Sequence, residues 1–147
     1  MRLIEVLNRI DSLKQNQLED AVKRSWLSDM EEQIVNEVVK PHEMPERVLG
    51  NELVQRYLET GERMYDENTD PDTELIAPPP YDDLYFWWLA AKVDLINLDN
   101  KQYKNDYQMY NNAYLTFQDY WNRTYMPIQK VCSFLSRAGK EKNDVFT

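Results

Sequence analysis

Acidic side chains at alternate positions are the first residues of this sequence whose spacing suggests chemistry. In the stretch DENTDPDTE, residues 66–74, side chains with oxygen atoms stand at every second position, as the ligands of a calcium-binding loop do. Such a loop also needs glycine at its sixth position and glutamate at its twelfth, and these positions hold Pro71 and Ala77. The pattern therefore predicts a solvated turn and no metal site.

The single histidine and the single cysteine are the other candidates for catalysis. His42 precedes Glu43, a pair suited to metal binding or proton transfer, but one histidine without further ligands predicts a surface residue. Cys132 is far from His42 in sequence and is predicted to be a small apolar residue, not an activated thiol. One cysteine also excludes an internal disulfide and a cysteine-rich zinc site. We therefore expect no enzyme, with no catalytic residue, cofactor or metal.

The charge of the chain is acidic and unevenly spread. Among 147 residues, 26 are acidic and 17 are basic, for a net charge of −9. Because binding to nucleic-acid phosphates depends on Lys and Arg, this balance argues against a protein that wraps DNA. Residues 43–75 hold ten acids and three bases, a net of −7, which leaves −2 for the rest. The acidity is thus largely a property of one segment.

The elements that position these residues are predicted to be helices. Apolar residues spaced three and four apart predict helices over residues 2–13 and 17–40, one that begins after Pro80, and one over 101–125. A short helix is expected over residues 52–60, within an otherwise solvated loop or loose hairpin. With only three glycines, sandwich and barrel folds are disfavoured. We predict an all-α fold, a small helical bundle with an acidic insertion at residues 43–75.

The last predicted helix has the clearest pattern. Its apolar stripe consists of six aromatic residues: Tyr103, Tyr107, Tyr110, Tyr114, Phe117 and Trp121. Aromatic rings also stack on single-stranded nucleic acid, but such proteins need a basic groove, and here Asp106 and Asp119 dilute the few bases. The stripe therefore predicts core packing, with extension into a subunit interface as an alternative. The short LDNKQ segment before it predicts an antiparallel hairpin with the preceding helix.

The preceding helix begins in a strongly aromatic run. Its predicted inner face is Tyr81, Leu84, Trp88, Ala91, Leu95 and Leu98. Tyr85, Phe86 and Trp87 are too many for that stripe, so we expect either the first two helices or a neighbouring subunit to cover them. Charged residues interrupt the run, and no uncharged apolar stretch reaches the ~18 residues of a membrane span. We expect a soluble protein whose single domain covers residues 1–127, followed by a C-terminal tail at 128–147.

Two stretches of this region carry a family resemblance. PYDDLYFWWLAAKVDLIN (residues 80–97) and YNNAYLTFQDYWNRTYMP (residues 110–127) resemble the head–tail connector, or adaptor, proteins of tailed bacteriophages and prophages. RLIEVLNRIDSLKQNQLEDAVKRSWLSDMEEQIVNEVV, residues 2–39, looks like the opening helices of the same family. The likeness covers residues 1–40 and 75–127, and it consists of helix faces and contains no catalytic motif.

The resemblance implies a structural role in the neck of the virion. Such proteins form a ring, usually dodecameric, that binds the portal protein, extends the DNA channel and docks a downstream neck or tail-completion protein. The chain would be made in the host bacterial cytoplasm, without a membrane partner. The residues expected to dock on the portal are Ile128, Val131, Phe134 and Leu135. The acids expected to line the channel, so that DNA passes without specific binding, are Glu59, Glu62, Asp66 and Glu67.

A second hypothesis explains the acidic segment without a virion. In it, residues 43–75 are the binding surface of a soluble interaction protein, either a DNA mimic or an inhibitor of a host enzyme. This hypothesis predicts a monomer or dimer that binds a basic target, with binding that weakens as salt rises. Association with portal-bearing particles distinguishes the two hypotheses.

Overall fold

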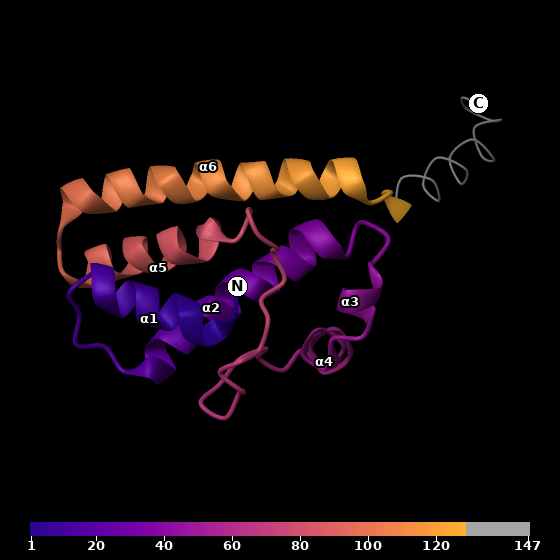
Figure 1. Cartoon of the computed structure of the whole chain (residues 1–147), viewed down its shortest axis with the longest axis horizontal. Helices are drawn as coiled ribbons and strands as arrows, with labels where there is room; N and C mark the ends of the chain where they lie inside the picture. The colour runs from indigo at the N-terminus through magenta and orange to yellow at the C-terminus, as the bar shows by residue number, and fades with distance from the viewer. Residues whose placement is uncertain (129–147) are drawn as a thin grey trace, which may run out of the picture.

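A computed structural model describes residues 1–128 of the chain as a bundle of α-helices (Figure 1). The helices are α1 (Leu3–Leu13), α2 (Asp20–Ile34), α3 (Glu46–Leu49), α4 (Glu52–Thr60), α5 (Asp83–Ile96) and α6 (Asn100–Thr124). A π-helical segment, η1 (Val35–Val39), continues α2 without a break. Within the described residues the β pairing consists of two isolated bridges. The predicted all-α bundle is confirmed.

The longest helices form an antiparallel hairpin that covers one side of the bundle. In Figure 1, α6 lies along α5 and continues past it over the end of α2, while α1 and α2 pack on the other side of α5. Asp99 caps α6 by accepting a hydrogen bond from the backbone N–H of Gln102 at 3.1 Å. The small residues Ala90 and Ala91 are buried on α5, as close packing of the two helices requires. The predicted hairpin is therefore present.

The predicted helix boundaries agree with the structure except at the start of α2. Helix α4 has the predicted bounds, and α6 is shifted by one residue. Helix α2 begins at Asp20, three residues later than predicted, because the Asn16 side chain accepts a hydrogen bond from Leu18 N–H at 3.2 Å and holds a turn there. The apolar spacing did not indicate the wider π-helical turn, in which Lys40 N–H bonds Val35 C=O at 2.9 Å.

The inner face of α5 differs from the predicted stripe. Leu84 and Ala91 are buried as expected, but Leu95 is 44% exposed and Leu98 is 84% exposed. Helix α5 is covered on two sides, so its buried surface is a broad arc and not one narrow stripe. Leu98 lies beyond the end of the helix, in the turn to α6, with φ of 59°. The predicted burial of Leu95 and Leu98 is therefore wrong.

The acidic segment 43–75 is built into the core. Its ten acidic residues are all exposed, but Met64, Tyr65 and Leu75 are buried, as is Ile76 directly after the segment. These apolar residues stand in pairs without helical or strand period, so the sequence pattern gave no sign of their burial. The prediction of a solvated loop or loose hairpin outside residues 52–60 is wrong for Met64, Tyr65 and Leu75, and also for Glu46–Leu49, which form α3. The segment presents acids outward and contributes apolar side chains inward.

Candidate functional site

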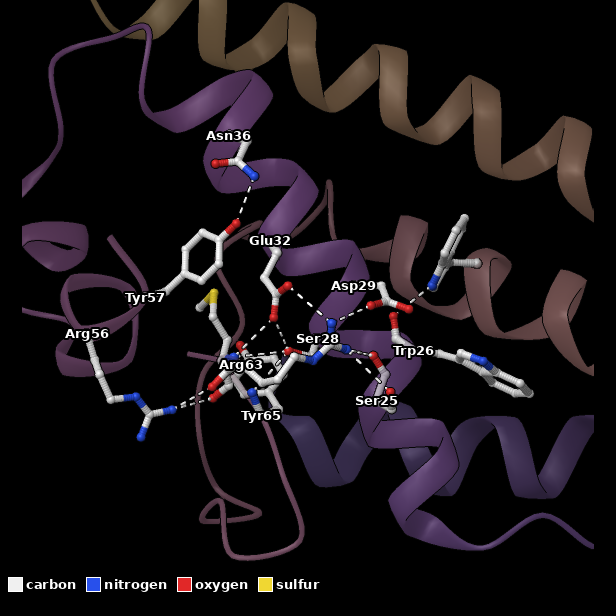
Figure 2. Close-up of polar contacts among 12 residues, drawn as sticks. Ser25, Trp26, Ser28, Asp29, Glu32, Asn36, Arg56, Tyr57, Arg63 and Tyr65 are labelled. Atoms are coloured by element: carbon white, nitrogen blue, oxygen red, sulfur yellow. Dashed lines mark hydrogen bonds and ion pairs between the residues drawn. The ribbon is translucent and has the colours of Figure 1, made fainter. Parts of the chain in front are cut away.

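The chain after α4 is fastened to α2 by hydrogen bonds, as Figure 2 shows. Ser28 Oγ accepts from the backbone N–H groups of Met64 and Tyr65 at 3.1 and 3.2 Å, and it donates to Glu32 Oε2 at 2.6 Å. Met64 N–H also donates to Glu32 Oε2 at 3.2 Å. These bonds satisfy backbone donors that would otherwise be buried without partners. They fix the position at which the acidic segment leaves the core after Tyr65.

Two arginines continue this attachment at the surface. Arg63 donates to the Ser25 carbonyl at 2.7 Å and forms ion pairs with Asp29 at 2.7 Å and Glu32 at 3.3 Å (Figure 2). Arg24, nearly buried on α2, donates to the carbonyls of Asp66 at 3.0 Å and Thr69 at 2.8 Å. The loop after α4 is thereby held on the side of α2.

A buried carboxylate lies beneath this loop. Glu31 has no exposed surface and accepts hydrogen bonds from Tyr65 Oη at 2.7 Å, from Tyr85 Oη and from Ile76 N–H at 3.0 Å. Burial raises the pKa of Glu31, and the three donors partly offset that rise. Burial and the neighbouring carboxylate raise the pKa of both tyrosines well above the usual value. The network joins α2, the acidic segment and α5, but it is closed to solvent.

The acids expected to line a channel are all exposed at the surface. Glu59 and Glu62 stand at the end of α4, Asp66 and Glu67 stand in the following loop, and all four are exposed. Asp66 Oδ1 accepts hydrogen bonds from Asn68 N–H at 2.9 Å and Thr69 Oγ1 at 3.2 Å, as in an acid-stabilised turn. Residues 1–128 contain no cluster of three or more His, Cys, Asp or Glu side chains placed to hold a metal ion.

The start of the expected docking tail is anchored at the other end of the hairpin. Glu43 N–H bonds the Met126 carbonyl at 2.8 Å, and Ile128 N–H bonds the Pro41 carbonyl at 3.0 Å. Ile128 is itself exposed. The remaining expected docking residues, Val131, Phe134 and Leu135, lie outside the described residues. The anchor fixes the position from which the tail leaves the bundle.

The three surplus aromatics of α5 have different surroundings. Tyr85 and Phe86 are buried in the core, and the Arg9 guanidinium lies 4.5 Å from the centre of the Phe86 ring. Trp87 is half-buried and lines a shallow cavity of about 270 Å³ with Met109 and other residues. Of the two alternatives for these residues, internal packing therefore applies to Tyr85 and Phe86. Trp87 keeps part of its ring at the surface.

A second acidic cluster was missed by the sequence analysis. Lys14 Nζ lies 3.0 Å from Asp94 Oδ1 and 2.7 Å from Asp106 Oδ2, and both carboxylates are almost fully buried. Burial and the adjacent Asp106 raise the pKa of Asp94 to about 6, whereas the pKa of Asp106 is lowered by its bonds to Asp94 and Lys14 despite burial. Asp106 lies on the aromatic face of α6, between Tyr103 and Tyr107. An acid on a face that is otherwise apolar is a sequence signal for a buried ion pair, here with Lys14.

Two further predictions concern single residues. His42 was expected at the surface but is buried, and its Nδ1 lies 2.7 Å from the Val38 carbonyl. The prediction failed because the pairing of residues 41–43 with 126–128 covers the ring. On the aromatic stripe, the members from Tyr110 to Trp121 are buried, while Tyr107 is 39% exposed. The stripe is core over most of its length.

Comparisons with known proteins give no relative: no family model, no curated protein and no solved structure matches this chain. Among the helices of residues 1–128, none is long and apolar enough to cross a membrane. The features of residues 1–128 that bear on function are the exposed acids after α4 and the backbone hydrogen bonds that hold residues 126–128 against residues 41–43.

Proposed function

We propose that this protein is a structural head–tail connector of a tailed phage or prophage. In this role it forms a ring beneath the portal, extends the DNA channel, and gives a downstream neck or tail-completion protein a docking surface. The proposal rests first on the resemblance of residues 80–97 and 110–127 to that family. The α5–α6 hairpin provides the helix pairing that those stretches require.

The observation that carries the proposal is the division of the chain into an acidic body and a basic apolar tail. Residues 1–128 contain 24 acids and 13 bases, a net of −11, whereas residues 129–147 contain 2 acids and 4 bases, a net of +2. An acidic surface repels DNA phosphates, which suits the wall of a DNA channel. An apolar segment with basic flanks suits docking into a groove of another protein. One chain thus has one surface for passage and one segment for attachment.

The channel role falls to the acids at the end of α4. Glu59, Glu62, Asp66 and Glu67 are exposed together, and the bonds from Ser28, Arg24 and Arg63 keep their loop on the bundle. A held loop keeps its charge at a fixed place, so the repulsion acts where the channel needs it. We propose that these acids face the DNA.

The tail test replaces its apolar residues. We expect Val131→Asp, Phe134→Asp and Leu135→Asp together to abolish co-sedimentation with portal-bearing capsids, because each aspartate places a charge in a docking groove. A matched control adds the same three charges at polar positions of the tail, as Ser133→Asp, Ser136→Asp and Asn143→Asp, and should still co-sediment. Equal binding by both triple variants contradicts portal docking through these residues.

The alternative function uses the same acids in a different way. Glu59 and Glu67 are exposed and form no ion pair within residues 1–128. An acidic interaction protein would present them to a basic partner, with binding that weakens at high salt. If wild-type protein does not co-sediment with portal-bearing capsids but binds a basic protein in low salt, the result supports this alternative over the connector.

A further inference from the structure

The turn between α5 and α6 lies at one end of the helical bundle (Figure 1), and its aliphatic side chains are exposed. In this hairpin tip, defined as residues 95–104, Leu95 is 44%, Ile96 is 56% and Leu98 is 84% exposed. Each of these side chains forgoes part of the stabilisation that full burial of a leucine or isoleucine provides. Single exposed leucines are common on protein surfaces, but three exposed aliphatic residues within four positions form a contiguous apolar patch.

Local preferences are broken in the same tip. Leu98 has φ of 59°, a left-handed conformation that glycine or asparagine adopts at lower cost. Lys101 and Lys104 stand in the first turns of α6, where the helix dipole favours acids, and the first turn contains no acid. The one exposed acid of the tip, Asp99, is used as the helix cap. Because local rules are broken most often at functional sites, the tip is a candidate contact surface.

The lysines of the tip are available to a partner. Neither Lys101 nor Lys104 forms an ion pair within residues 1–128, and both are exposed. The tip therefore presents the exposed side chain of Leu98 near the positive charges of Lys101 and Lys104, on a molecule whose net charge is otherwise strongly negative. Its complement is an acidic surface with an apolar floor.

The same chain contains such a surface. An acidic groove of about 440 Å³ lies between the start of α4 and the loop 66–73. Its carboxylates are Glu52, Asp66 and Asp70, and the half-buried Leu53 adds an apolar side chain. Pockets of ~300–1,000 Å³ bury whole drug-sized ligands, so one leucine side chain fits.

The charges of the groove are largely unmatched within its own copy. Glu52, Asp66 and Asp70 take part in no ion pair among residues 1–128. The one base in the lining, Arg56, already donates to the Arg63 carbonyl at 2.7 Å and lies 3.7 Å from Glu62. The groove is therefore suited to a basic, aliphatic partner segment.

We propose that the hairpin tip of one copy docks in the acidic groove of a second copy, with Leu98 in the groove and with Lys101 and Lys104 beside Glu52 and Asp70, so that Asp66 is left to the channel-lining acids. The α5–α6 turn lies away from α4 and from the loop after it, which line the groove (Figure 1), so the tip of one copy does not reach its own groove. Contact between two different surfaces is heterologous, and such contacts generate rings when the rotation closes and filaments when it does not. The inference rests on the proposed connector function, for which it supplies the contact between ring neighbours.

The test reverses the charge of each surface separately. The tip-reversed variant carries Lys101→Glu and Lys104→Glu, which the helix dipole tolerates. The groove-reversed variant carries Glu52→Lys and Asn68→Lys, which leaves the turn-forming Asp66 and Asp70 in place. Sedimentation velocity at an intermediate salt concentration should show assemblies for wild type and monomers for each variant alone. An equimolar mixture should assemble again, because each acidic tip meets a basic groove and each basic tip meets an acidic groove.

Replacement of Leu98 gives an independent measurement of how much the tip contributes to self-association. Leu98→Gly removes the side chain and suits the positive φ, so we expect an unchanged or higher melting temperature together with at least tenfold weaker self-association. Leu115→Ala removes another leucine, 56% exposed on α6 outside the tip, and should leave self-association unchanged. Equal assembly by Leu98→Gly and wild type overturns the proposal.

The outcomes separate this proposal from the connector function. A wild type that stays monomeric at the highest attainable concentration, or a mixture that fails to assemble, overturns the tip-to-groove contact. Co-sedimentation of wild type with portal-bearing capsids in the same experiment keeps the connector function in place. Charge-dependent assembly without any capsid binding has the opposite meaning: the contact stands and the connector function falls.

Discussion

Glu31 shows how much a single buried residue contributes to this fold. Its carboxylate is the shared acceptor for Tyr65, Tyr85 and the Ile76 N–H. We predict that Glu31→Leu destabilises the protein by more than about 3 kcal/mol, because three buried donors lose their acceptor at ~1–3 kcal/mol each. Glu31→Gln keeps one carbonyl oxygen and should cost less. Urea denaturation followed by circular dichroism measures both, and a Leu variant as stable as wild type contradicts the role of the network.

Asp94 makes stability depend on pH in a direction opposite to that of most carboxylates. Its pKa of about 6 exceeds the ordinary value of 3.8, so between these values the folded state binds more protons than the unfolded state. Stability contributed by Asp94 therefore rises as pH falls from 7 toward 4, by an amount on the order of 1–3 kcal/mol. The raised pKa of Glu31 acts in the same direction.

The matching experiment is a series of melting temperatures between about pH 3 and pH 8. Asp94→Asn should flatten the rise toward acid and leave Lys14 paired with Asp106, 2.7 Å away. Below about pH 4 the lowered pKa of Asp106 takes over, and stability should fall in both proteins as that carboxylate is protonated. An Asn variant with the wild-type slope excludes Asp94 as the source.

Sequence analysis predicted few of these single residues, for a physical reason. Lys14 and Asp94 are 80 residues apart in sequence, and Glu31 and Tyr85 are 54 apart. Helical spacing shows which face of one helix is apolar, but it does not show which acid on another helix meets it. Acids in an acidic chain also look alike until their burial is known. The exposed Glu59, Glu62, Asp66 and Glu67 were predicted as a group because they share one segment.

At the scale of elements, two neighbouring aromatic residues of α5, Phe86 and Trp87, differ in how far they are buried in the core. Trp87 is half-buried beside Phe86, with ring centres 5.0 Å apart. We predict that Phe86→Ala costs about 3–5 kcal/mol, as is usual for a buried phenylalanine, and that Trp87→Ala costs less because part of its ring already contacts solvent. Thermal unfolding of both variants gives the comparison. A Trp87 variant as damaging as the Phe86 variant would place its whole ring in the core.

The elements themselves were more predictable than their contacts. Helix α4 has the expected bounds and α6 is shifted by one residue, because in both cases the apolar spacing agrees with the helix that the chain forms. The acidic segment was misjudged, because Met64, Tyr65, Leu75 and Ile76 enter the core from irregular chain. Burial of that kind is set by tertiary packing and leaves no period in the sequence.

For the whole molecule, the segregation of charge is the property that the proposals share. The described body has a net charge of −11 and the following 19 residues have +2. Two such bodies repel one another at long range, so assembly should strengthen with salt up to the point where the tip-to-groove ion pairs are themselves screened. Self-association measured across a salt series should pass through a maximum. A steady rise would mean that the contact is purely apolar.

The paired backbone at the exit of the tail has a mechanical consequence. Tension on the tail reaches the hydrogen bond from Ile128 N–H to the Pro41 carbonyl and then the bond from Glu43 N–H to the Met126 carbonyl. Pro41 and Glu43 lie within four residues of the end of η1, while Met126 and Ile128 lie within four residues of the end of α6. A pulling force is therefore shared between two helices from distant parts of the chain, and the bundle bears the load as a unit before α6 begins to peel away.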